Sequence, residues 1–209
     1  MEEREIVKRL LEVSKTLGLI KKADMGACLK SQVFREALGW YGLEAPELIA
    51  EPDLILVFED YKRLIDDVMI IAVELKCFQA KGELKQLKKD LRKAFREIGQ
   101  PLRYLPLGFD SAVLWHIFED IGHEELIRQY VRLIGDDTIE RLNLPIVYFA
   151  TTALSNDALR LYWPLDIKCD IGYAIRYLKN LCDGKRNPVL DDNVVKKRRK
   201  ALKVSLGIP

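Results

Sequence analysis

An acidic residue and a lysine two positions apart could combine a carboxylate and an ammonium group at one reactive point. The sequence contains five such pairs in which the acidic residue comes first: Asp60–Lys62, Glu74–Lys76, Glu83–Lys85, Asp166–Lys168 and Asp183–Lys185. A carboxylate can hold a hard divalent cation, and a neighbouring ammonium group can stabilise charge that develops on a reacting oxygen. The pair is useful only where the backbone directs both side chains to the same place, so the local structure must decide among the five.

Strand geometry favours the pair Glu74–Lys76. It ends the run "VMIIAVEL", which is rich in β-branched residues and is typical of a buried strand. Residues two apart in a strand point to the same face, whereas in a helix they lie about 200° apart. Glu83 and Lys85 stand at the start of a predicted helix and diverge. The sequence therefore predicts a paired site at Glu74 and Lys76 and a surface role for the second Glu-Leu-Lys.

A second carboxylate lies upstream, at the start of another short apolar run. In "EPDLILV", Asp53 follows Pro52, and twenty residues separate Asp53 from Glu74. That length allows a hairpin that brings the two strands side by side. Two converging carboxylates repel each other unless a cation lies between them, and hard oxygen ligands favour Mg²⁺ or Mn²⁺. Lys76 would add positive charge near a phosphate or an attacking water.

Pro52-Asp53 followed by Glu74-Leu75-Lys76 resembles the signature of the PD-(D/E)xK nuclease superfamily. The resemblance covers roughly residues 32–118, and the order of predicted elements there is similar as well. It implies a restriction-endonuclease-like α/β fold with an αβββαβ core and a Mg²⁺-dependent deoxyribonuclease. It also implies that Asp53, Glu74 and the Leu75 carbonyl bind the metal and that Lys76 assists the attacking water. Small members, Holliday junction resolvases among them, commonly act as homodimers, so the resemblance also implies DNA and a second copy as partners.

Two further positions resemble supporting features of this superfamily. Gln100 and Tyr104 have the spacing of the Q-x-x-x-Y motif that RecB-like members carry after the lysine strand, where it supports the site. Pro101 departs from a continuous helix and places Gln100 at a helix junction; plain packing is the alternative for both residues. Many members add a glutamate from the leading helix, for which Glu36 and Glu47 both remain candidates.

Basic residues gather on one side of the predicted helix "GELKQLKKDLRKAFREIG". On a helical wheel the stripe consists of Lys85, Lys88, Lys89, Arg92 and Arg96. A stripe of cations suits a phosphate backbone, although a solvated helix face is the alternative. A second basic group lies near the end of the sequence, where either a DNA contact or a frayed, solvated end is expected: Lys196, Lys197, Arg198, Arg199 and Lys200.

The remaining pattern predicts a single mixed α/β domain. Helices are expected at 2–17, 27–38, 83–99, 124–133 and 171–184, and strands at "DLILVF", "VMIIAVEL", "SAVLWHIF" and "LPIVYFATT". We expect a nuclease-like core at about 26–120, a C-terminal elaboration at about 121–190 and a basic tail at 191–209. His116 lies inside an apolar strand pattern and is expected to be a core histidine.

The composition narrows the class of protein without identifying a partner. The net charge is +2, 49% of the residues are hydrophobic and 32% are charged, as in globular domains. The absence of a long apolar run and of C-x-x-C spacing predicts an intracellular protein with reduced cysteines and no membrane segment. The abundance of Lys, Arg and Glu is a bias seen in hyperthermophile proteins. The competing hypotheses are a nucleic-acid-binding protein that retains the fold without catalysis and an unrelated α/β domain.

Overall fold

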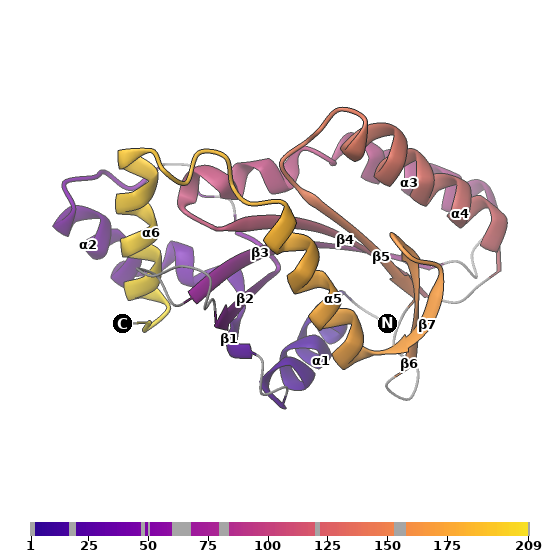
Figure 1. Ribbon diagram of the computed structural model, residues 1–209, viewed down its shortest axis with the longest axis horizontal. Helices are drawn as coiled ribbons and strands as arrows, with labels where there is room; N and C mark the ends of the chain where they lie inside the picture. The colour runs from indigo at the N-terminus through magenta and orange to yellow at the C-terminus, as the bar shows by residue number, and fades with distance from the viewer. Residues whose placement is uncertain are drawn as a thin grey trace.

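The computed structural model describes residues 3–16, 20–46, 49, 51–59, 68–79, 84–119, 122–152 and 158–208. Within these ranges the strands form one mixed sheet in which spatial order follows chain order (Figure 1). Neighbours are antiparallel from β1 to β3, parallel from β3 to β5 and antiparallel again from β5 to β7. The strands are β1 Ile20–Asp24, β2 Leu54–Glu59, β3 Val68–Gln79, β4 Ser111–Glu119, β5 Val147–Thr152, β6 Ala158–Trp163 and β7 Ile167–Asp170.

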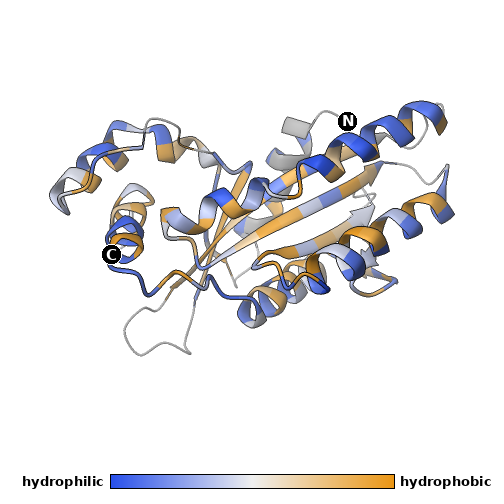
Figure 2. Ribbon diagram, turned by 90° about the horizontal axis from the view of Figure 1, so that it is seen from above, coloured by the Kyte–Doolittle hydropathy of each residue, from blue (hydrophilic) through white to orange (hydrophobic). Residues whose placement is uncertain are grey.

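Helices cover both faces of this sheet, and the apolar side chains between the layers form two cores. One face is covered by α2, α3, α4, α6 and the 3₁₀ helix η2, and the other by α1 and α5. Figure 2 shows orange along the strands and blue on the outer sides of the helices. The helices are α1 Glu3–Thr16, η1 Gly26–Lys30, α2 Gln32–Trp40, α3 Leu84–Arg96, η2 Gln100–Leu107, α4 Glu124–Arg132, the π-helical segment η3 Leu133–Glu140, α5 Ile171–Gly184 and α6 Asn193–Ser205.

The α/β class and most of the predicted elements are confirmed, with one clear error in the leading helix. The predicted helix at 27–38 is divided, because η1 ends before Ser31 and α2 begins after it. Ser31 has extended backbone angles, and its hydroxyl accepts a hydrogen bond from the Phe34 amide at 3.2 Å. A serine in that conformation is an N-cap, so the helix starts again at this point.

The basic tail is also ordered, which excludes the frayed end as an alternative, while a DNA contact there stays a prediction. The tail forms α6, which begins after the N-cap Asp192 and packs against α2. Arg199 is only 5% exposed, so it belongs to the core and not to a solvated cationic cluster. No helix in the described ranges has both the length and the apolar character needed to cross a membrane.

Candidate active site

The hairpin of β2 and β3 brings Asp53 opposite Glu74. Leu54 pairs with Val73 in antiparallel register, and the next step of that register joins Asp53 to Glu74. Asp53 Oδ2 accepts a hydrogen bond from the Leu75 amide at 2.7 Å, which fixes the carboxylate against β3. The expected hairpin is therefore confirmed, and it places the two acids across from each other at the start of β2.

Lys76 lies on the same face as Glu74, as strand alternation predicts. Its Nζ is 2.7 Å from Glu74 Oε1 and 3.8 Å from Glu97 Oε2. Glu74 is 7% exposed, so its charge is shielded from solvent and the lysine is its direct counter-ion. A charge pair in this setting interacts more strongly than one in water.

Tyr104 supports Glu74 from η2. The Tyr104 hydroxyl donates a hydrogen bond to Glu74 Oε2 and lies 3.2 Å from the carbonyl oxygen of Glu51. Burial, together with the charge of Glu74, raises the pKa of Tyr104 well above its ordinary value. The hydroxyl therefore stays protonated and acts as a donor, which fits the supporting position expected from the sequence.

Gln100 and Glu36 make no hydrogen bond or ion pair with this cluster that the described residues show. Gln100 begins η2, as Pro101 indicated, and its side-chain Oε1 is buried with no hydrogen-bond partner among the described residues. Glu36 is exposed on α2, and its Oε1 accepts a hydrogen bond from the side-chain Nε2 of Gln32 at 3.0 Å. In the described ranges, no hydrogen bond or ion pair joins Glu36 to Asp53 or Glu74. Glu47 lies outside the described residues.

Glu97 and Gly26 belong to the site, although sequence analysis did not select them. Glu97 follows the end of α3 and faces Lys76; only its position one residue after the basic stripe could have drawn attention to it. Gly26 lies against Pro52, since a Cβ at Gly26 would be 1.9 Å from the Pro52 carbonyl oxygen. The missing side chain lets η1 pack directly against the residue that precedes Asp53.

The acidic residues fit the donor preference of Mg²⁺. This ion is commonly held by one or two carboxylates together with water and substrate phosphates. Asp53 and Glu74 supply that number of carboxylates, and the Leu75 carbonyl stays a predicted ligand. Among the described residues, no group of three or more His, Cys, Asp or Glu side chains is arranged to enclose a metal.

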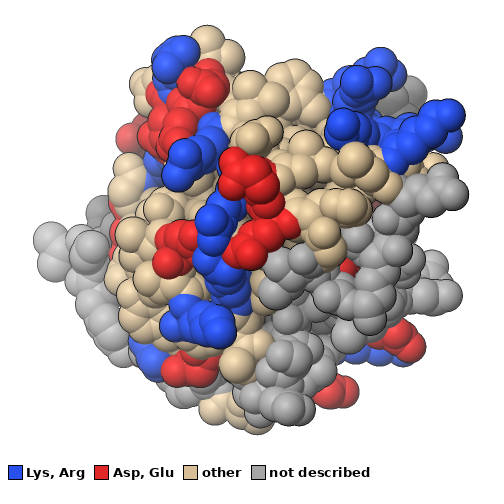
Figure 3. Space-filling model, turned by 90° about the vertical axis from the view of Figure 1, so that its right-hand side faces the viewer, with Lys and Arg blue, Asp and Glu red and all other residues tan. Residues whose placement is uncertain are grey.

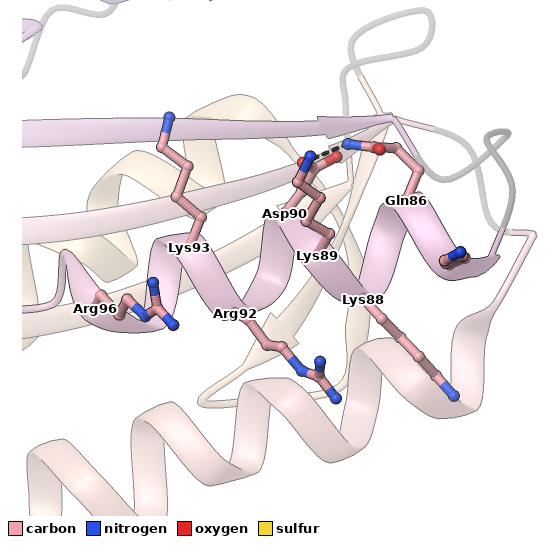
Figure 4. Close-up of a pocket in the computed structure, with 8 residues that line it drawn as sticks. Gln86, Lys88, Lys89, Asp90, Arg92, Lys93 and Arg96 are labelled. Carbon is pink, nitrogen blue, oxygen red and sulfur yellow. Dashed lines mark hydrogen bonds between the residues drawn. The ribbon is translucent and has the colours of Figure 1, made fainter.

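The basic stripe of α3 is exposed along its whole length. Lys85, Lys88, Lys89, Arg92 and Arg96 line a shallow concavity of about 910 Å³ together with Gln86, Asp90 and Lys93. In Figure 4, Lys88 and Arg92 extend toward the neighbouring helix, while Lys93 extends to the opposite side. Figure 3 shows blue side chains gathered at one upper corner, at the end of the molecule that carries α3 and α4. The exposure is as predicted, and binding of phosphates stays a prediction.

His116 is a core histidine, as expected, and it lies next to Lys76. It is fully buried on β4, pairs in register with Lys76, and its Nδ1 is 3.1 Å from the Tyr148 hydroxyl. The ring stacks on Tyr130 at a centroid distance of 5.6 Å. Burial, with a smaller contribution from the charge of Lys76, lowers the pKa of His116 to about 3.

His116 is therefore expected to make the stability depend on pH. In the unfolded chain the pKa returns to about 6.5, so between pH 6.5 and 3 the unfolded state binds a proton that the folded state excludes. This contribution is complete above pH 6.5 and is lost as the pH falls. Between pH 6 and pH 4 the wild type should lose about 2 kcal/mol more unfolding free energy than His116→Gln. Urea denaturation at several pH values measures this loss.

The second histidine provides the control for that measurement. His123 lies at the N-terminal end of α4 and is partly exposed. The variant His123→Gln makes the same exchange outside the core and is measured alongside His116→Gln. Equal pH slopes for His116→Gln and the wild type would show that His116 is not the responsible group.

The cysteines and the comparisons with known proteins add no further assignment. All four cysteines are free thiols. No family model matches the chain, and neither the curated proteins nor the solved structures include a match.

Proposed function

We propose that this protein is a Mg²⁺-dependent nuclease of the PD-(D/E)xK type that hydrolyses DNA phosphodiester bonds. The observation that carries the proposal is the arrangement of three side chains on one face of the sheet. Asp53, which directly precedes β2, accepts a hydrogen bond from the Leu75 amide of β3 at 2.7 Å, and Lys76 Nζ lies 2.7 Å from Glu74 Oε1. A glutamate and a lysine in contact, with a second carboxylate bonded to the backbone between them, are suited to phosphoryl chemistry.

Each side chain has a definite role in this proposal. Asp53 and Glu74 would hold Mg²⁺ or Mn²⁺, which supplies Lewis-acid stabilisation of the phosphoryl oxygens. Lys76 would orient the attacking water and balance negative charge that develops during hydrolysis. Tyr104 positions the Glu74 carboxylate by its hydrogen bond to Oε2. The exposed cations of α3 would neutralise backbone phosphates.

The topology around the site supports the restriction-endonuclease-like assignment. The antiparallel strands β1, β2 and β3 are followed by α3 and then by β4, which is parallel to β3. With α1 before them, these elements have the αβββαβ order, and η1 and α2 are inserted between β1 and β2. A homodimer that cuts two strands belongs to the same proposal and rests on the resemblance alone.

A second candidate function is nucleic-acid binding without catalysis. The observation in its favour is that both oxygens of Glu74 are already engaged, Oε1 by Lys76 and Oε2 by Tyr104. A carboxylate that is satisfied in this way has a structural role even when no metal binds. The two functions differ in whether a divalent ion changes the behaviour of the protein.

The test is cleavage of labelled single-stranded, duplex, flap and four-way junction DNA with Mg²⁺, Mn²⁺ or EDTA. We expect cutting that requires the metal and falls at least about a hundredfold in Asp53→Asn, since groups that stabilise charge in the transition state have effects of this size. Asp137→Asn is the matched control, because Asp137 is an exposed partner of Arg141 on η3. DNA binding without cutting, unchanged by EDTA and by Asp53→Asn, would favour the binding protein.

A further inference from the structure

A groove between α3 and α4 combines an apolar floor with a basic edge. It encloses about 550 Å³, within the range of pockets that hold small ligands. Phe95 and Leu133 remain 40% and 45% exposed although both lie beside buried neighbours. The groove is lined by Lys88, Leu91, Arg92, Phe95, Arg96, Leu126, Gln129, Tyr130 and Leu133.

The charge on the edge of this groove has one sign. Lys88, Arg92 and Arg96 follow one another at intervals of four residues, so they lie along one side of α3. Within the ranges that the structure describes, none of the three forms an ion pair. Figure 3 shows tan atoms between the blue corner and a second corner where red and blue are mixed. The groove is therefore open to an anionic ligand that also has apolar surface.

The inner end of the groove adjoins the candidate active site. Tyr130 lines the groove and stacks on His116, which is the register partner of Lys76. Glu97, next in sequence to Arg96, faces Lys76 at 3.8 Å. Tyr130 is only 7% exposed, and its buried hydroxyl has no hydrogen-bond partner among the described residues. The groove is thus linked to Lys76 through the stacked rings of Tyr130 and His116 and through Glu97.

We propose that the α3–α4 groove binds single-stranded DNA and leads the strand to Asp53, Glu74 and Lys76. Phe95 provides the surface on which an unpaired base stacks, and Arg92 and Arg96, which flank it along α3, contact the phosphates on either side. A duplex presents its phosphates to the protein while its bases stay paired and stacked on each other. Its bases therefore cannot stack on an exposed aromatic ring that lies between cations. A second copy bound through the same face would bring two cationic stripes together, which is unfavourable. The inference names the substrate class of the proposed nuclease and rests on that function.

The experiment measures DNA binding in EDTA, so that cleavage is not needed for a signal. Fluorescence anisotropy would compare a labelled single strand with a duplex of equal length, for the wild type and Phe95→Ala. We expect the single strand to bind about tenfold more weakly to Phe95→Ala, the usual effect of removing one stacking partner, and duplex binding to change by less than about twofold. Arg92→Gln should weaken the binding of both forms and lower the salt dependence.

Two further variants separate stacking from general effects of the substitution. Phe95→Trp keeps an aromatic surface and should retain the affinity, with quenching of its fluorescence when the strand binds. Leu142→Ala removes another exposed apolar side chain, 63% exposed and after the end of η3, and should bind like the wild type.

Specific outcomes would overturn the inference. If Phe95→Ala binds the single strand as tightly as the wild type does, or loses equal affinity for the single strand and the duplex, the groove contacts only phosphates and no base stacks on Phe95. Dissociation of a homodimer by Phe95→Ala without a change in DNA affinity would assign the groove to a second copy. If Phe95 has no effect while Asp53-dependent cleavage persists, only the groove assignment fails. If Phe95-dependent binding is found without any metal-dependent cleavage, only the nuclease proposal fails.

Discussion

Glu74→Gln should lower the rate of metal-dependent DNA cleavage by about a thousandfold, at the upper end of the effect of removing one preorganised charge-stabilising group. Glu74 has three roles at once: it would bind the ion, it neutralises Lys76, and it accepts the Tyr104 hydrogen bond. Glutamine has the same size but no charge, so the loss would concern chemistry more than packing. Single-turnover cleavage with saturating Mg²⁺ measures the rate, and thermal unfolding checks that the fold is kept.

The control for Glu74→Gln is the same exchange on the other side of the sheet. Glu12 is exposed on α1, which packs against the face opposite to the site. Glu12→Gln should therefore cleave at the wild-type rate. A Glu74→Gln protein that folds and cleaves within about threefold of the wild type would contradict the proposed role, since transition-state charge stabilisation cannot be that small.

The part of the site that was predictable follows from the alternation of side chains in strands. Glu74 and Lys76 share a face because residues two apart in β3 must do so. Asp53 could be added because a hairpin of that length returns the chain to the same edge, and the observed register agrees. These features depend on short stretches of sequence, where local periodicity determines the geometry.

The features that were missed depend on contacts between segments far apart in the sequence. The strand β1 has the sequence "IKKAD", whose three charged residues do not show the apolar pattern typical of a strand. It forms because it pairs in antiparallel register with β2. Glu97 approaches Lys76 only because α3 packs back across β3. For the basic run in α6 the sequence left a DNA contact and a solvated end open, because its one buried member, Arg199, cannot be distinguished from its neighbours without knowing its partner.

That partner is the basis of the second large effect. Arg199 is held inside the protein by Asp110, which is fully buried: their Nη1 and Oδ2 atoms are 2.6 Å apart. The guanidinium also donates to the Val68 carbonyl at 2.9 Å, and Asp110 Oδ2 accepts from the Ile70 amide at 2.6 Å. The backbone of α6 also lies close to Gly108, since a Cβ at Gly108 would be 2.5 Å from the backbone nitrogen of Arg199. One ion pair thus joins α6 to the starts of β3 and β4.

Arg199→Met is expected to reduce the free energy of unfolding by about 3–5 kcal/mol, because it leaves the buried Asp110 carboxylate without its main counter-charge. Urea denaturation measures the change. Lys197→Met is the matched control: Lys197 is exposed on the same helix, so its loss should cost less than about 0.5 kcal/mol. Adding Asp110→Asn to Arg199→Met removes a buried charge that would keep only the longer contact with Arg186, at 3.7 Å, so the double variant should be less destabilised than the sum of the single variants. Strict additivity would mean that Arg199 stabilises α6 through packing of its side chain and not through its charge.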